Sequence, residues 1–240
     1  MRFTSEQRLD DGVLEREFTL GDIPGILWTS GSAPAPLILI GHNGGLHKRE
    51  SRLVARARHY AARYGHAVAA IDHPGHGDRP RSAAGEQARA DLRRAMAAGE
   101  PVDGILESFV APLVDTAVPE WRTTLDALLS LPEIGGPVGY SGMTAVGIRL
   151  AAAEPRISAA GFFAGGYVPR AQREEARQVT VPVLFLLQWD DEGNDRQRAL
   201  DLFDAFGTEE KTLHANMGGH AGTPWFEVDD GARFFARHLK

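Results

Sequence analysis

The sequence contains no cysteine among its 240 residues. This absence excludes disulfide bonds, a thiolate nucleophile and metal sites with cysteine ligands. No apolar run reaches the ~18 positions that a membrane-spanning helix requires, so we expect no membrane partner. The first residues, MRFTSEQRLDDG, lack the apolar core of a secretory signal. From these absences we expect a cytoplasmic protein.

Positive charge is also scarce, because 26 lysines and arginines face 32 acidic residues, for a net charge of -6. Proteins that bind nucleic acid usually carry a basic face, so nucleic acid is not an expected partner. The composition, 43% hydrophobic and 24% charged, is that of an ordinary globular protein. We expect a single domain over residues 1–240 and a small-molecule partner, and a homodimer stays open.

Short apolar segments alternate along the chain with segments of helical periodicity. Expected strands are 16–20, 25–29, 35–41, 66–72, 136–141, 157–164, 179–189 and 210–215, and expected helices are 50–64, 121–131, 196–206 and 231–239. Strands that are apolar throughout and alternate with helices predict an α/β fold with a mainly parallel central sheet and helices on both faces. In such sheets ligands bind beyond the carboxyl ends of the strands, so candidate residues are sought there.

One segment, residues 78–117, interrupts this alternation. It is too long for a simple loop and contains helical stretches, and its second half includes the apolar run GILESFVAPLV at 104–114. We expect a helical cap or lid, inserted within the domain, over the carboxyl ends of the strands. An ordinary helix pair packed on the rim is the alternative.

Ser141 lies in PVGYSGMTAVGIRL, which reads as a strand end, a tight turn and a helix start. The pattern G-x-S-x-G marks a serine nucleophile on such a turn, where the hydroxyl is exposed at the top of the sheet. Gly139 and Ser141 fit this pattern, whereas Met143 stands where the last glycine is expected. A serine hydroxyl also needs a base, an acid that orients the base, and donors for the developing oxyanion.

The candidate base and acid each follow an expected strand. His220 lies in the glycine-containing loop ANMGGHAGTP, while its rival His214 falls inside an expected strand. Asp191 lies in FLLQWDDEGN, at the end of a buried strand, and the adjacent Asp190 stays an alternative on spacing. The chain order is then serine, aspartate, histidine.

The candidate oxyanion donors are backbone N–H groups. The glycine-rich segment IGHNGGLHK, residues 40–48, follows a buried strand and can turn sharply. We expect the N–H of Gly44 and the N–H of Gly142 to receive the oxyanion.

These five segments together resemble the α/β-hydrolase fold serine esterases, of the dienelactone-hydrolase-like or prolyl-oligopeptidase-like branch. LILIGHNGG resembles the oxyanion stretch with Asn43 in place of a glycine, AIDHPGHGDR resembles the D-x-x-G-H-G segment, GYSG the elbow, LLQWDDE the acid stretch and GGHAG the histidine loop. The resemblance covers nearly the whole chain and implies a Ser141–His220–Asp191 triad without a cofactor. Dienelactone hydrolases proper use a cysteine nucleophile, so that activity is not implied.

We therefore expect hydrolysis of carboxylic esters of small-to-medium uncharged substrates through an acyl-enzyme, with little activity on charged or very long acyl chains. Apolar walls are expected from the insertion, from the residues beside the serine and acid, and from the end of the strand at 157–164. The expected wall residues are Phe109, Met143, Phe162 (or its neighbour Phe163) and Trp189.

Four other functions fit parts of the pattern. An acyltransferase or a peptidase would use the same triad, and a catalytically silent binding protein would use the same fold. A metal hydrolase is a further alternative, since the segment DHPGHGD offers Asp72, His73, His76 and Asp78, with His42 and His47 one strand earlier. The glycines of that segment fit a turn and no later ligands are evident, so we expect no metal and interpret His73 and His76 as loop supports.

Overall fold

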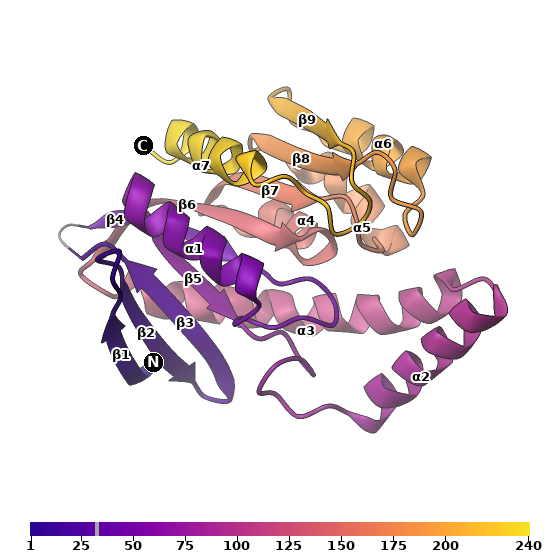
Figure 1. Ribbon diagram of the computed structural model, residues 1–240, viewed down its shortest axis with the longest axis horizontal. Coiled ribbons are helices and arrows are strands. Elements are labelled where there is room, and N and C mark those ends of the chain that lie inside the picture. The colour runs from indigo at the N-terminus through magenta and orange to yellow at the C-terminus, as the bar shows by residue number, and fades with distance from the viewer. Residues whose placement is uncertain (32–33) are drawn as a thin grey trace.

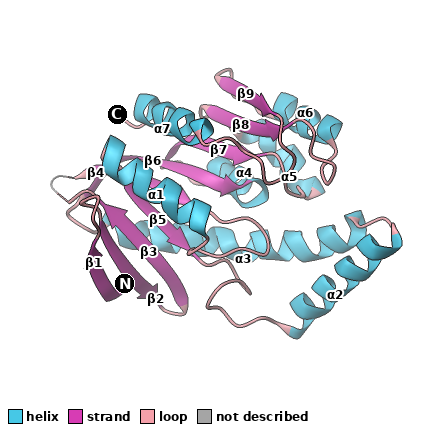
Figure 2. Cartoon of the chain, in the orientation of Figure 1, coloured by secondary structure: helices cyan, strands magenta, loops and turns pink. Residues whose placement is uncertain are grey.

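The computed structural model describes residues 1–31 and 34–240. The strands are β1 (Arg2–Arg8), β2 (Leu14–Leu20), β3 (Ile23–Thr29), β4 (Ala35–Ile40), β5 (Ala67–Ile71), β6 (Ile134–Met143), β7 (Ile157–Phe163), β8 (Val183–Gln188) and β9 (Lys211–Asn216). The α-helices are α1 (Ser51–Tyr64), α2 (Ala83–Ala98), α3 (Asp103–Leu129), α4 (Thr144–Ala153), α5 (Arg170–Glu175), α6 (Arg196–Ala205) and α7 (Phe226–His238). Figure 2 shows this alternation, and the expected α/β class is confirmed.

The nine strands form one sheet in the order β1-β2-β3-β5-β4-β6-β7-β8-β9. The strands β5, β4, β6, β7, β8 and β9 run parallel, whereas β1, β2 and β3 pair antiparallel with one another and β3 pairs antiparallel with β5. The mainly parallel sheet is therefore as predicted. The strand β1 is an addition, because its largely exposed and polar sequence carries no apolar signal.

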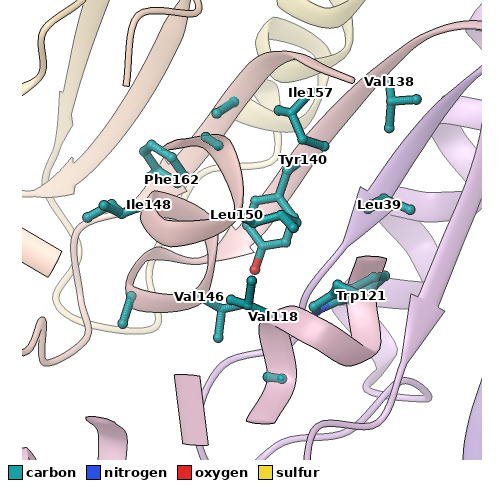
Figure 3. Packing of buried hydrophobic residues seen from close by; sticks show 14 of the residues in the cluster. Leu39, Val118, Trp121, Val138, Tyr140, Val146, Ile148, Leu150, Ile157 and Phe162 are labelled. Carbon is teal, nitrogen blue, oxygen red and sulfur yellow. The ribbon is translucent and has the colours of Figure 1, made fainter. Parts of the chain in front are cut away.

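Helices cover both faces of the sheet (Figure 1). On one face, α1 and α7 pack on a core that includes Trp28, Tyr60 and Phe235. On the other face, α3 and α4 pack on a core that includes Trp121 and Tyr140, whose rings meet edge-on with centroids 6.1 Å apart (Figure 3). Burial of such side chains is the main term that stabilises the fold.

The segment between β5 and β6 forms a helix pair. The helix α2 begins at an N-cap serine, Ser82, and ends at Gly99, whose φ of 66° suits glycine. The helix α3 runs for 27 residues and passes through Pro112 and Pro119, although a proline removes one helical hydrogen bond. Figure 1 shows α2 and the first half of α3 extending away from the sheet and joined at their far end, from which they diverge. Despite the length of α3, no helix within the described ranges is both long and apolar enough to cross a membrane.

Candidate active site

Ser141 lies near the carboxyl end of β6, in a central position of the sheet. Its register partners are Ile40 on β4 and Gly161 on β7. The strand continues to Met143 before α4 begins, so the strand-to-helix turn falls two residues later than the sequence pattern predicts. Ser141 Oγ accepts a hydrogen bond of 3.2 Å from Nη1 of Arg56 on α1. The hydroxyl therefore faces the layer that contains α1 and α7.

The loop that carries the candidate oxyanion donor Gly44 begins beside the serine, where two glycines meet. Gly41 N–H donates to the carbonyl of Ser141 at 2.9 Å. A Cβ atom on Gly142 would stand only 2.3 Å from the carbonyl oxygen of Gly41, so the position requires glycine. This close approach brings the loop against the serine, and Gly44 and Gly142 line one cavity with Ser141.

The loops after β8 and β9 bring Asp191 and His220 together. Oδ2 of Asp191 and Nδ1 of His220 are 2.7 Å apart, and the Asp191 side chain is 2% exposed. Asp190 instead accepts hydrogen bonds from the backbone N–H groups of Gly218 and Gly219. The two adjacent aspartates therefore have different partners: one holds the imidazole, and the other holds the loop that carries it.

A cavity of about 460 Å³ between the sheet and helices α1 and α7 contains both Ser141 and His220. This volume is in the range of small-molecule sites. Among the residues that the structure describes, Ser141 Oγ has no hydrogen bond to His220, and its partner is Arg56. Two residues of the expected triad, Ser141 and His220, thus line one cavity, and the third, Asp191, is hydrogen-bonded to His220.

Three of the expected wall residues lie outside this cavity. Phe109 on α3 packs against α2, with the guanidinium of Arg89 5.0 Å from its ring centroid. Trp189 is 42% exposed and stacks with Arg196 at 4.4 Å. Met143 packs against the core on the α3 and α4 face. The expected positions of these three side chains differ from the structure for one reason. The cavity lies on the face of the sheet that α1 and α7 cover, and none of the three side chains is in its lining.

The fourth wall residue, Phe162, belongs to the cavity lining, but its ring is 1% exposed and stacks on Phe206 at 5.4 Å in the opposite core. Successive side chains of a strand point to opposite faces, so the neighbour Phe163 faces the cavity. Its ring meets that of His220 edge-on at 5.8 Å. The aromatic wall at the end of β7 is therefore Phe163.

Three histidines of the metal-hydrolase alternative lie together, because His42 of the oxyanion loop packs against His73 and His76. The rings of His42 and His73 are 4.3 Å apart, and the rings of His42 and His76 are 5.2 Å apart. Burial lowers the pKa of His42 to about 4 and also lowers that of His73. Nε2 of His42 accepts from the N–H of His73, and Nε2 of His73 accepts from Trp121 Nε1. With these lone pairs engaged, the cluster fits loop support better than metal binding.

A buried ion pair joins the oxyanion loop to the DHPGHGD segment. Nζ of Lys48 lies 2.7 Å from Oδ2 of Asp72, and Lys48 also pairs with Asp78. Burial opposes ionisation of Asp72, but hydrogen bonds from Lys48 and from the Asp78 N–H outweigh it and lower its pKa. The acidic side chains of the DHPGHGD segment are therefore committed to a lysine.

Within the described part of the chain, one other trio could hold a cation: His214, Glu227 and Asp230. His214 Nδ1 is hydrogen-bonded to Glu227 at 2.7 Å, and Asp230 pairs with Arg233 at 2.7 Å. These partners account for the cluster without an ion.

Two arginines of α1 are the site residues that sequence reasoning missed. Arg56 contacts the serine, while Arg52 donates to the carbonyls of Ala221 and Thr223 and so ties α1 to the histidine loop. Arg52 and Arg56 are four residues apart, so they share one face of the helix. This spacing, next to the apolar positions of 50–64, was the signal in the sequence that could have identified them.

No family model and no curated protein matches this sequence. Solved structures do. A cold-adapted esterase from an Arctic intertidal metagenomic library, in its PEG-bound form, is 30% identical with a TM-score of 0.79, and each chain is covered over 100%. Its native form matches at 28% identity with a TM-score of 0.74, again over 100% of both chains.

More distant structures share the fold. The acetyl xylan esterase from Paenibacillus sp. R4 is 15% identical with a TM-score of 0.70, over 99% of this chain and 88% of that one. A predicted CIB-like hydrolase from Thermoplasma acidophilum is 14% identical with a TM-score of 0.65, over 94% and 98%.

Proposed function

Since this chain belongs to the α/β-hydrolase fold family, we propose that it hydrolyses carboxylic esters through an acyl-enzyme formed on Ser141. The observation that carries the proposal is the hydrogen bond between Asp191 and Nδ1 of His220, a histidine that lines the same cavity as Ser141. Esterases are among the solved structures to which the chain is similar, which supports the same reaction class.

In the first half of the reaction, Ser141 Oγ attacks the ester carbonyl and His220 Nε2 takes the hydroxyl proton. Asp191 keeps the imidazole in the tautomer with hydrogen on Nδ1 and stabilises the imidazolium that forms. The N–H groups of Gly44 and Gly142 are the proposed donors to the oxyanion. Collapse of the tetrahedral intermediate breaks the bond to the alcohol, which receives the proton from His220.

In the second half, His220 takes a proton from water as the water oxygen attacks the acyl carbonyl. The acid is released and the proton returns to Ser141 Oγ. The steps use side chains, backbone N–H groups and water, so the proposal requires no cofactor. Apo active sites often show long catalytic contacts that shorten when substrate binds, which accommodates the present separation of Ser141 from His220.

A catalytically silent binding protein is the second candidate, because Ser141 is bonded to Arg56 and not to His220. A fluorophosphonate probe separates the two, since it labels a serine only when its hydroxyl is activated. We expect stoichiometric labelling of the natural chain, none of Ser141→Ala, and loss of nearly all ester turnover in that variant. Ser108→Ala, at an exposed serine of α3, is the control and should label normally. Retained turnover in Ser141→Ala would refute the nucleophile, and an unlabelled natural chain would favour the binding protein.

A further inference from the structure

Arg56 projects from α1 into the cavity at the proposed nucleophile. Its Nη1 donates to Ser141 Oγ at 3.2 Å, and it lines the cavity while it is only half-buried. An acyl group that is covalently attached to Ser141 Oγ would therefore lie next to the Arg56 guanidinium.

Arg56 forms no ion pair with any carboxylate in residues 1–31 and 34–240. Its helical neighbour Arg52 is held by two loop carbonyls, so it has a structural task. The cavity-lining carboxylate nearest in sequence, Glu50, caps α1 by accepting from the N–H groups of Arg52 and Leu53. Arg52 and Glu50 are thus engaged in structural contacts, whereas the hydrogen-bond partner of Arg56 in this part of the chain is the proposed nucleophile itself.

The second cavity-lining carboxylate is engaged as well. Both carboxylate oxygens of Glu227 have partners, because Oε2 is bonded to His214 Nδ1 and Oε1 accepts from Asn216 Nδ2, each at 2.7 Å. A cation that is partly desolvated gains most from an opposite charge at hydrogen-bond distance. The cavity therefore offers a positive charge to a ligand, and its own negative charges are satisfied.

We propose that Arg56 binds a carboxylate on the acyl part of the substrate, so that half-esters of short dicarboxylic acids are a preferred substrate class. The planar guanidinium matches a carboxylate with two parallel hydrogen bonds. The acyl part is favoured over the alcohol because it is the part that stays bonded to Ser141 Oγ, the atom that Arg56 contacts. This substrate class rests on the proposed esterase function and differs from the uncharged esters that the sequence alone predicts.

The test compares two esters of the same shape: monoethyl glutarate, and the ethyl ester of glutaric acid monoamide, which replaces the carboxylate with a neutral amide. Ester cleavage is followed as released ethanol, and enzyme concentrations are set by fluorophosphonate labelling. We expect the natural chain to have a kcat/KM about ten-fold or more higher for the acid than for the amide. Arg56→Gln should lower that acid-to-amide ratio by about ten- to hundred-fold, while Arg56→Lys retains part of it.

Arg63→Gln is the matched control, since Arg63 is an exposed arginine of the same helix and the substitution removes the same charge. Its ratio should equal that of the natural chain. A second measurement needs no variant: glutarate should inhibit cleavage of ethyl butyrate at least ten-fold more strongly than pentanoate does.

Equal turnover of acid and amide by the natural chain, or an unchanged ratio in Arg56→Gln, would overturn the carboxylate subsite while leaving the esterase intact. If Arg56→Gln instead alters the preference for an acid on the alcohol, measured with 4-carboxyphenyl butyrate, the assignment to the acyl part is overturned. If neither ester is cleaved and the serine probe does not react, the proposed function itself fails, and that result is distinct from both others.

Discussion

Two adjacent aspartates, Asp190 and Asp191, provide a sharp test at the scale of single residues. The buried Asp191 holds the His220 imidazole, whereas the exposed Asp190 accepts from two backbone N–H groups of the histidine loop. An amide at position 191 would favour the wrong imidazole tautomer, so Asp191→Asn should lower kcat by about 10⁴-fold. Asp190→Asn keeps an acceptor oxygen and should lower kcat far less.

Steady-state rates on 4-nitrophenyl acetate, with circular dichroism as the check on folding, measure both variants. A larger loss in Asp190→Asn would transfer the orienting role to that residue.

Single residues also show where sequence reasoning succeeds and where it stops. The resemblance of LLQWDDE to the acid stretch of a family implies Asp191, while spacing alone leaves Asp190 open, and the structure places Asp191 against His220. The position of Arg56 over Ser141 was not predicted, because helical periodicity identifies the apolar face of α1 but not what its polar edge contacts. The position of a side chain that depends on packing between elements far apart in the chain leaves no pattern in the local sequence.

At the scale of elements, the packing of Phe109 between helices α2 and α3 leads to a prediction. The ring lies between the two helices, where the Arg89 guanidinium is 5.0 Å from its centroid. It does not belong to the cavity that contains Ser141. We therefore expect Phe109→Ala to lower the free energy of unfolding by about 1–3 kcal/mol and to leave the ratio of rates on short and bulky esters unchanged.

Thermal melts and a series of aryl esters measure the two effects for Phe109→Ala. A shift toward bulkier substrates would instead show that the helix pair reaches the substrate, as a lid would.

A second prediction at the scale of elements concerns an ion-pair cluster between α3 and the end of α4, formed by Glu154, Arg156, Arg122 and Asp126. Hydrogen bonds from Arg156, outweighing the effect of burial, and a further bond from Arg122 lower the pKa of Glu154 to about 2. Arg156 also pairs with Asp126 on α3. Because the pKa is lower in the folded chain, the stability that Glu154 contributes is complete above its ordinary pKa of 4.5 and is lost as the pH falls toward 2.

Glu154→Gln should therefore lower the melting temperature at pH 7, and its difference from the natural chain should shrink between pH 4.5 and about 2. Melting curves at pH 7, 4 and 3 test this. If the difference in melting temperature stays constant with pH, Glu154 stabilises the fold through packing and not through its charge.

At the scale of the whole molecule, the alternation of strands and helices was enough to predict the sheet, since each buried parallel strand carries its own apolar signal. The face on which the cavity opens was not predictable in the same way. It depends on how α1, near the start of the chain, and α7, at its end, pack together over the sheet (Figure 1). The expected wall residues Phe109, in the insertion, and Trp189, in a loop, both lie outside this cavity.

The cavity of about 460 Å³ is lined jointly by residues of the sheet, α1 and α7, so these elements shape the space for an acyl chain. Its floor beside the nucleophile is Gly161, where an added Cβ would lie 3.4 Å from both Ser141 Oγ and Phe235 Cζ. Those are ordinary contact distances, so Gly161→Ala should fold while it removes space next to the reacting carbonyl. One methylene in a pocket is worth about 1–3 kcal/mol in kcat/KM, which gives the expected scale.

The measurement is kcat/KM on 4-nitrophenyl esters from acetate to laurate. For the natural chain we expect the highest values on short-to-medium acyl groups and a decline toward laurate, because a longer acyl chain loses more rotational freedom when it binds. In Gly161→Ala the decline should begin at shorter acyl groups, with about a ten-fold loss on hexanoate relative to acetate. Gly166→Ala is the control, since a Cβ there meets nothing within 4 Å and Gly166 lies outside this cavity. An identical profile for Gly161→Ala and the natural chain would show that acyl groups bind away from β7, and the cavity between α1, α7 and the sheet would then have another occupant.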